Sequence, residues 1–162
     1  MTRCCFYLLL LALRSDAVWS AENRASAKDL SIVCHVQLVL GTNQEKASEA
    51  KYRAIGPKLS GQLSSVFQWK NYWEVNHQMV MVQNGKADRV RLSKDCEVEI
   101  KVIPATAAAT NAVREIRLFR KGALICKSKR EIGSMKMSIL GGDSKDGNSW
   151  FVVVRRDEPQ YQ

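Results

Sequence analysis

The chain has 162 residues, of which 46% are hydrophobic and 25% charged, and its formal net charge is +9. This length suits one ordinary domain rather than two, and the apolar content predicts a packed core and excludes an intrinsically disordered chain. The basic balance points to anionic partners without specifying a fold.

The first residues predict a secretory signal peptide over residues 1–21. A positive start precedes an apolar run over Cys4–Leu13. That run is too short for a membrane span of roughly 20 residues but fits the central region of a leader. Small residues between Ala17 and Ala21 predict cleavage there, with a retained anchor as the alternative. We therefore expect an exported protein, periplasmic or extracellular, without a transmembrane segment after cleavage.

Cleavage would leave residues 22–30 as a flexible lead-in and residues 31–158 as a single β-rich domain. The net charge would fall from +9 to +8, because two arginines and one aspartate are lost. Three cysteines would remain, Cys34, Cys96 and Cys126. They allow at most one disulfide and leave one thiol over, or they are small buried residues without a bond.

The residues after the lead-in begin with a strand. The segment LSIVCHVQLVLG, residues 30–41, is apolar on both faces, which predicts a central strand. Residues 42–55 are equally consistent with a helix and a solvated loop. Pro57 then opens a predicted amphipathic helix. Its apolar stripe consists of Leu59, Leu63, Val66 and Phe67.

After this helix the pattern alternates with a period of two. The predicted inward face consists of Trp73, Val75, His77, Met79 and Met81. Asn84-Gly85 follows, a pair that favours a type I′ hairpin because both positions tolerate positive φ. That turn would place Met79 opposite Val90 and His77 opposite Leu92.

A second predicted hairpin turns at Ser93–Asp95. It would place Arg91 opposite Glu97 and Arg89 opposite Glu99, and cross-strand opposite charges are favourable by roughly 0.2–1 kcal/mol each. The apolar face agrees with the same register, so the two turns together predict a three-stranded meander.

The rest of the chain continues the β pattern. We expect a hairpin turning at Lys121-Gly122, a short strand over residues 135–140 and a last strand over residues 149–156. Seven or so strands with one short amphipathic helix predict a single antiparallel β-sandwich or a partly open barrel.

The histidines and cysteines are the right residue types for zinc, but their placement argues against a site. Cys34 and His35 are neighbours on a strand and face opposite ways. The predicted register separates His77 from Cys96 by two strand spacings, roughly 9–10 Å. No CxxC pair is present. We expect no metal and no cofactor.

No hydrolase motif is complete either. Gly142-Asp143-Ser144 resembles the block of a lipase family that lies near the chain start and needs a later histidine, and none follows here. Cys126, beside Lys127, is the best-placed candidate for a reactive thiolate, and the loop Asp143–Asn148 lacks the spacing of an EF-hand. We expect no enzymatic activity and keep a hydrolase of unknown type as an alternative.

Four aromatic residues, Phe67, Trp69, Tyr72 and Trp73, crowd where the helix meets the next strand. Such rings can staple helix to sheet. Alternatively, Trp69 and Tyr72 stay exposed and stack on a glycan or peptide.

Residues 112–131 carry seven cations against two carboxylates. The cations are Arg114, Arg117, Arg120, Lys121, Lys127, Lys129 and Arg130. This surplus predicts a binding site for an anionic polymer or glycan of the cell envelope, and no feature points to nucleic acid. Alternatively, the charges only protect a strand edge from aggregation. A structural or assembly subunit that pairs with a protein partner through a β edge is the second hypothesis.

The segments IGPKL, FQWKNYWEVN, RVRLSKDCEVEI and LGGD…WFVVVRRDEP together resemble a set of short exported bacterial proteins without an assigned activity. The resemblance covers residues 33–159 and implies a bacterial secretory origin and a compact single domain. It supplies no catalytic residue, cofactor or partner.

Overall fold

The computed structural model describes residues 31–104, 112–132, 136–143, 147–156, 159 and 161. These residues form two antiparallel sheets and one short helix, so the predicted mainly β fold is confirmed. The predicted signal peptide over residues 1–21 and the lead-in over residues 22–30 lie outside the described residues.

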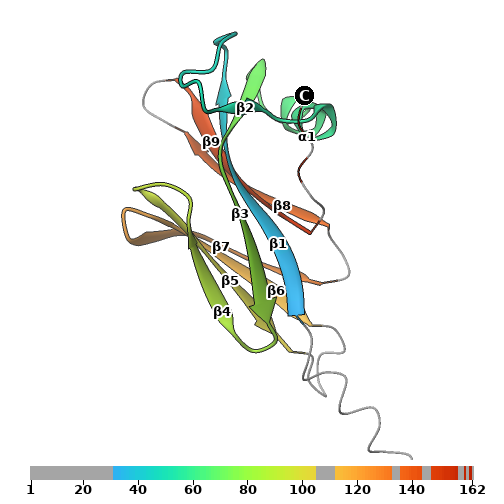
Figure 1. Ribbon diagram of the computed structural model, residues 1–162. Coiled ribbons are helices and arrows are strands. Elements are labelled where there is room, and N and C mark those ends of the chain that lie inside the picture. Colours follow the sequence, from blue (N-terminus) through green and yellow to red (C-terminus); the bar gives the residue numbers. More distant parts are fainter. Residues whose placement is uncertain are drawn as a thin grey trace, which may run out of the picture.

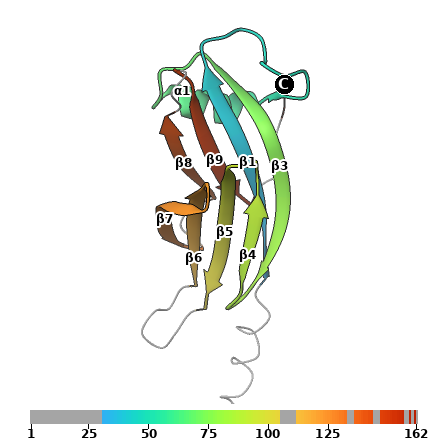
Figure 2. The same ribbon diagram turned by 90° about the vertical axis from the view of Figure 1, so that its left-hand side faces the viewer.

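The two sheets stack as a sandwich whose edges do not join. The five-stranded sheet has the order β2-β3-β1-β9-β8, and the four-stranded sheet has the order β4-β5-β6-β7. Figure 1 labels the elements, and Figure 2 shows the four-stranded sheet in front of the five-stranded one. The elements are β1 (Ser31–Thr42), β2 (Arg53–Ala54), α1 (Pro57–Ser64), β3 (Asn71–Gln83), β4 (Ala87–Arg91), β5 (Cys96–Ile103), β6 (Val113–Arg120), β7 (Ala123–Glu131), β8 (Met137–Asp143) and β9 (Ser149–Arg155).

The first strand is central, as its apolar residues on both faces predicted, because each face covers a separate core. The core between the sheets includes Val36, Leu38, Val98, Ile100, Ile116, Leu118 and Val152. A second cluster lies on the outer face of the five-stranded sheet and includes Leu59, Leu63, Tyr72, Phe151 and Val153. The helix α1 therefore packs on the side of this sheet that faces away from the four-stranded sheet.

The predicted helix forms but is shorter than its apolar stripe. Leu59 and Leu63 are buried, whereas Val66 is 73% exposed because α1 ends at Ser64. The preceding residues 43–51 form turns and bends rather than a helix.

The predicted inward face of β3 is wrong for its second half. Val75 has no partner in the ladder between β1 and β3, which makes it a β-bulge, and the extra residue reverses the side-chain alternation. Beyond the bulge Val82 faces the core, while Met79 and Met81 lie on the outer face and are 69% and 61% exposed. Apolar residues occupy both alternating positions here, so the sequence left the register open.

The first predicted hairpin is also wrong, although its turn forms. Gly85 has φ = 76°, and the Lys86 amide donates to the Gln83 carbonyl at 3.0 Å. The chain then crosses from one sheet to the other, because β3 pairs with β1 and β4 pairs with β5. Met79 consequently lies opposite His35 rather than Val90, and His77 lies opposite Gln37 rather than Leu92.

The other two predicted hairpins form, and the β4–β5 pair has the expected register. Arg91 lies opposite Glu97, with 2.7 Å between Nη2 and Oε1, and Arg89 lies opposite Glu99.

The β6–β7 turn places Lys121-Gly122 at φ values of 49° and 80°, as a type I′ turn requires. In the β6–β7 pair the register is not the one that a plain two-residue turn predicts, because Ile125 has no partner between Leu118↔Cys126 and Phe119↔Leu124. This bulge shifts the ladder by one residue and leaves Ile125 48% exposed instead of on the face of Leu118.

Candidate anion-binding groove

The outer face of the four-stranded sheet is a ladder of charges. The register from β4 to β7 places six cations and four carboxylates on this face: Arg89, Arg91, Lys101, Arg117, Lys127, Lys129, Glu97, Glu99, Glu115 and Glu131. Most of these cations have an intramolecular partner. Arg91 and Arg89 both pair with Glu97, at 2.7 and 3.2 Å, and the Arg89 guanidinium also lies 4.0 Å from the centre of the Phe119 ring.

Glu115 is the hub of this ladder. Its side chain is 3% exposed, and its oxygens lie 2.6 Å from Arg117, 3.3 Å from Lys127 and 3.2 Å from Lys129. Burial alone would raise the pKa of this carboxyl, but hydrogen bonds from the two lysines and the arginine outweigh burial and lower the pKa below its ordinary value. Three of the seven predicted binding cations are thus held by one carboxylate, and Arg117 also contacts Glu99 at 3.0 Å.

Two further predicted cations lie at the β6–β7 turn. The Arg120 guanidinium is 5.5 Å from the centre of the Trp150 ring, and both residues line a small cavity of about 170 Å³ together with Asp95. Lys121 occupies the turn, and its amide donates to the Asp95 carbonyl at 2.8 Å.

The remaining two, Arg114 and Arg130, are brought together at the other end of the hairpin. They lie directly opposite each other on β6 and β7, on the face that points toward the five-stranded sheet. Arg114 is only 4% exposed, and its Nη2 donates to Ser138 Oγ of β8 at 2.9 Å. Like charges directly opposite in a sheet are destabilising, so this pair is an unfavourable arrangement unless something negative lies nearby.

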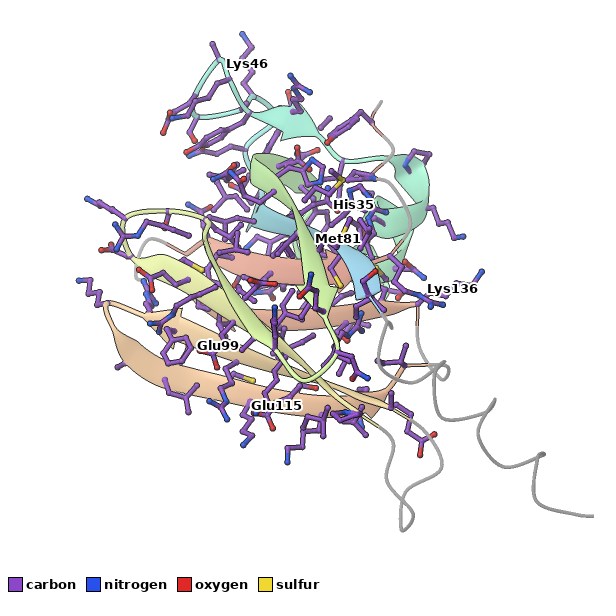
Figure 3. The ribbon with its side chains drawn as sticks, turned by 60° about the horizontal axis from the view of Figure 1, so that its bottom comes forward. His35, Lys46, Met81, Glu99, Glu115 and Lys136 are labelled. Carbon is purple, nitrogen blue, oxygen red and sulfur yellow. The ribbon has the colours of Figure 1, made fainter. Side chains whose placement is uncertain are left out.

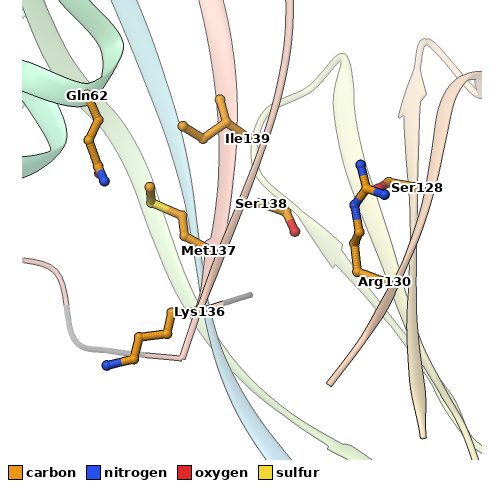
Figure 4. Close-up of a pocket in the computed structure, with 7 residues that line it drawn as sticks. All are labelled: Gln62, Ser128, Arg130, Lys136, Met137, Ser138 and Ile139. Carbon is orange, nitrogen blue, oxygen red and sulfur yellow. The ribbon is translucent and has the colours of Figure 1, made fainter. Parts of the chain in front are cut away.

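A groove of about 480 Å³ opens beside this arginine pair, along the edge of β8. Figure 4 shows that Ser138 of β8 points toward Ser128 and Arg130 of β7, whereas Lys136, Met137 and Ile139 point to the other side of β8, toward Gln62 of α1. The lining residues are Gln62, Ser128, Arg130, Lys136, Met137, Ser138 and Ile139, and none of these seven is acidic. The groove therefore combines two cations and two hydroxyls with the apolar side chains of Met137 and Ile139.

The aromatic cluster packs on the outer face of the five-stranded sheet. Phe67 and Tyr72 lie 4.5 and 6.0 Å from Phe151 between ring centres, and Tyr72 is 3% exposed. Trp69 is half-buried, and its Nε1 donates to the Gly147 carbonyl at 3.2 Å. Trp73 points to the face that covers the four-stranded sheet, because it lies opposite Leu40, which shares that face of β1 with Leu38. Of the two predicted contact rings, only Trp69 reaches the surface.

The three described cysteines are not bonded to one another. Burial raises the pKa of the Cys96 thiol to about 11. Burial also raises the pKa of Cys34, although the nearby Arg114 and Arg156 oppose that rise. Cys126 is exposed on the edge strand β7. Two of the three thiols are therefore protonated and covered, which does not suit a nucleophile.

The histidines are far from Cys96 but close to each other. Cys34 and Cys96 both belong to the core between the sheets, whereas His35 Nδ1 lies 3.1 Å from His77 Nε2 on the outer face of β1 and β3. Within the described part of the chain, no three residues among His, Cys, Asp and Glu are grouped to hold a metal ion.

The sequence identified part of this groove and missed the rest. Arg130 was predicted from the cation count of one hairpin, and Arg114 borders the groove through Ser138. Three lining residues were missed because they lie outside that hairpin: Lys136 precedes β8, Ser138 lies in β8, and Gln62 lies in α1. Lys136 and Ser138 lie next to and within an edge strand, and Gln62 carries no sequence signal for this groove.

No helix among the described residues is long and apolar enough to cross a membrane. Comparison with protein-family models, curated protein sequences and solved structures returned no significant match.

Proposed function

We propose that the chain is an exported, non-enzymatic binding domain for an anionic component of the cell envelope, and that the groove between β7 and β8 is its binding site. The Arg114–Arg130 pair is the observation that carries this proposal. An anion beside these two opposite arginines would offset the repulsion between their like charges. The hydroxyls of Ser128 and Ser138 can donate to its oxygens.

The charge distribution favours this groove over the outer face of the same hairpin. A polyanion on the outer face would compete with Glu97, Glu99 and Glu115 for cations that already have partners. None of the described residues that line the groove is acidic, so a ligand there meets Arg130 and Lys136 without competition from the lining side chains.

The size and lining of the groove indicate the ligand class. Small-molecule sites usually occupy about 300–1,000 Å³, and a groove of about 480 Å³ accommodates one or two sugar units. Met137 and Ile139, on the outer face of β8, supply apolar contact for a carbon skeleton that bends around the edge of this strand, while the cations suit phosphate, sulfate or a uronate carboxylate. An acidic glycan unit fits this combination best.

The test is salt-dependent retention on dextran sulfate. We expect R130A/K136A to weaken binding about 10–100-fold, because hydrogen bonds to charged groups contribute roughly 1.5–3 kcal/mol each. The charge-matched control is K86A/K94A, which removes two exposed lysines from the turns flanking β4. A loss of the same size in both variants would mean that net charge alone binds the matrix.

A third variant tests the outer face. R117A/K127A removes two cations of the outer face that do not line the groove. If it weakens binding more than R130A/K136A does, the outer face is the site. Retention that does not respond to salt contradicts an electrostatic site altogether.

A second candidate function follows from the open edges of the sandwich. β7 and β8 are edge strands of their respective sheets, and β7 exposes Leu124 and Ile125 at 52% and 48%. Such edges can pair with an extended segment of another chain. A concentration-dependent oligomer in light scattering would support self-assembly through them, and a monomer at high concentration would remove it.

A further inference from the structure

The outer face of the five-stranded sheet carries a cluster that the groove does not use. His35 and His77 lie diagonally across the β1–β3 ladder, with 3.1 Å between Nδ1 and Nε2. Their ring centres are 5.3 Å apart and their planes differ by 22°. Two imidazole nitrogens therefore face each other on the surface of the sheet.

That separation is close to the spacing of two ligands on one metal ion. Nitrogens bound at 2.0–2.1 Å with a tetrahedral angle lie about 3.3–3.4 Å apart. A small rotation of either ring turns its lone pair from the other nitrogen toward a common point above the sheet. In the neutral pair, one of the two facing nitrogens carries the hydrogen of this contact. That ring can hold its hydrogen on its other nitrogen instead, so both facing nitrogens offer a lone pair and the ion binds without net loss of a proton.

Two thioether side chains lie on the same face of this ladder. Met79 lies directly opposite His35 on the same face, where cross-strand Cβ atoms are about 4.5–5.5 Å apart. Met81 follows on that face, and Figure 3 shows it with His35 on the same ladder. Both methionines are largely exposed, at 69% and 61%, so burial does not explain them. Their three rotatable bonds allow the sulfur to reach a neighbouring ligand site.

The cluster suits a soft monovalent ion better than zinc. Thioethers and imidazoles are ligands of Cu(I). The carboxylate on this face, Glu74, is bonded to Gln37 and to the Tyr161 hydroxyl. Arg155 lies opposite His35 on β9, and its charge disfavours a divalent ion more than a monovalent one.

We propose that His35, His77 and Met79 form a binding site for Cu(I). The site lies on β1 and β3, separated from the groove by β9. Copper binding is therefore independent of anion binding, and either can fail without the other.

The experiment is an anaerobic Cu(I) titration in competition with bicinchoninate, a chromogenic Cu(I) chelator. It uses a C126S background, because the exposed Cys126 thiol also binds Cu(I). We expect one equivalent of Cu(I) to be withdrawn from the chelator, and Zn(II) to bind more weakly. Outer-shell changes already cost 10–100-fold in metal affinity, so H77A and M79L, which remove ligands, should weaken Cu(I) binding at least about 100-fold.

The control variant is Q78A, which changes the intervening residue on the opposite face of the same strand. It should bind Cu(I) like the C126S parent. M79L should fold normally, because leucine keeps the approximate volume of an exposed methionine side chain. Cu(I) should raise the Tm of the parent but not the Tm of M79L. Absence of Cu(I) uptake, tighter binding of Zn(II), or unchanged affinity in H77A or M79L would overturn the site.

Discussion

Replacement of Glu115 by glutamine tests whether the cations of the outer face stabilise the fold through their ion pairs with this carboxylate. The carboxylate has three ion-pair partners and is 3% exposed, whereas the side chains of those partners are 36–55% exposed. In E115Q the amide keeps the volume but loses the charge, and the three cations can turn to solvent. The expected loss of stability is therefore that of three surface ion pairs rather than that of one fully buried ion pair.

At 0.2–1 kcal/mol for each pair, E115Q should lower the free energy of unfolding by about 1–3 kcal/mol. Urea unfolding measures this directly. With a slope of about 2 kcal/mol/M, the midpoint should fall by about 0.5–1.5 M at an unchanged slope.

The control for this prediction is E97Q. Glu97 pairs with two arginines rather than three cations, and its side chain is 23% exposed, so we expect a smaller loss than in E115Q. If E115Q were as stable as the wild type to within about 0.3 kcal/mol, or no less stable than E97Q, Glu115 would not organise the sheet.

Three further outcomes follow from the same structure. Because the pKa of Glu115 is lowered from 4.5, its stabilising contribution is present above about pH 4.5 and is lost as the pH falls through the folded-state value; acid titration of unfolding should show this loss in the wild type and not in E115Q. Of the described thiols, Cys126 should react with iodoacetamide in the native protein at pH 8, whereas Cys34 and Cys96 should react only after denaturation, which mass spectrometry of labelled peptides would check. Gly41→Ala would place a Cβ 2.9 Å from an aromatic ring carbon, so we expect a loss of about 1–3 kcal/mol in urea unfolding, and an unchanged midpoint would show that this ring can move.

Local sequence signals predicted the elements well because their physical causes are local. Alternating Arg and Glu residues specified the register of β4 and β5, since opposite charges and apolar residues both favoured one alignment. The Lys121-Gly122 turn follows from the two positive φ values that such a turn needs. The central place of β1 follows from its apolar residues on both faces.

The partner of β3 could not be predicted in this way. Asn84-Gly85 forms a turn whether the chain folds back within a sheet or crosses to another, and only packing against β1 decides between them. The bulge at Val75 then moved His77 and Met79 to the outer face, which is why the histidine pair was missed. The groove depends on the approach of β7 to β8, which no single segment encodes.

The central claim is that an anion binds between β7 and β8. The most direct measurement is an amide chemical-shift titration of the labelled protein with a sulfated oligosaccharide. The account predicts that residues 128–130 and 136–139 shift with a common affinity, and that those shifts disappear in R130A/K136A. Shifts centred on Glu97, Glu99 and Lys127, with residues 136–139 unaffected, would place binding on the outer face and contradict it.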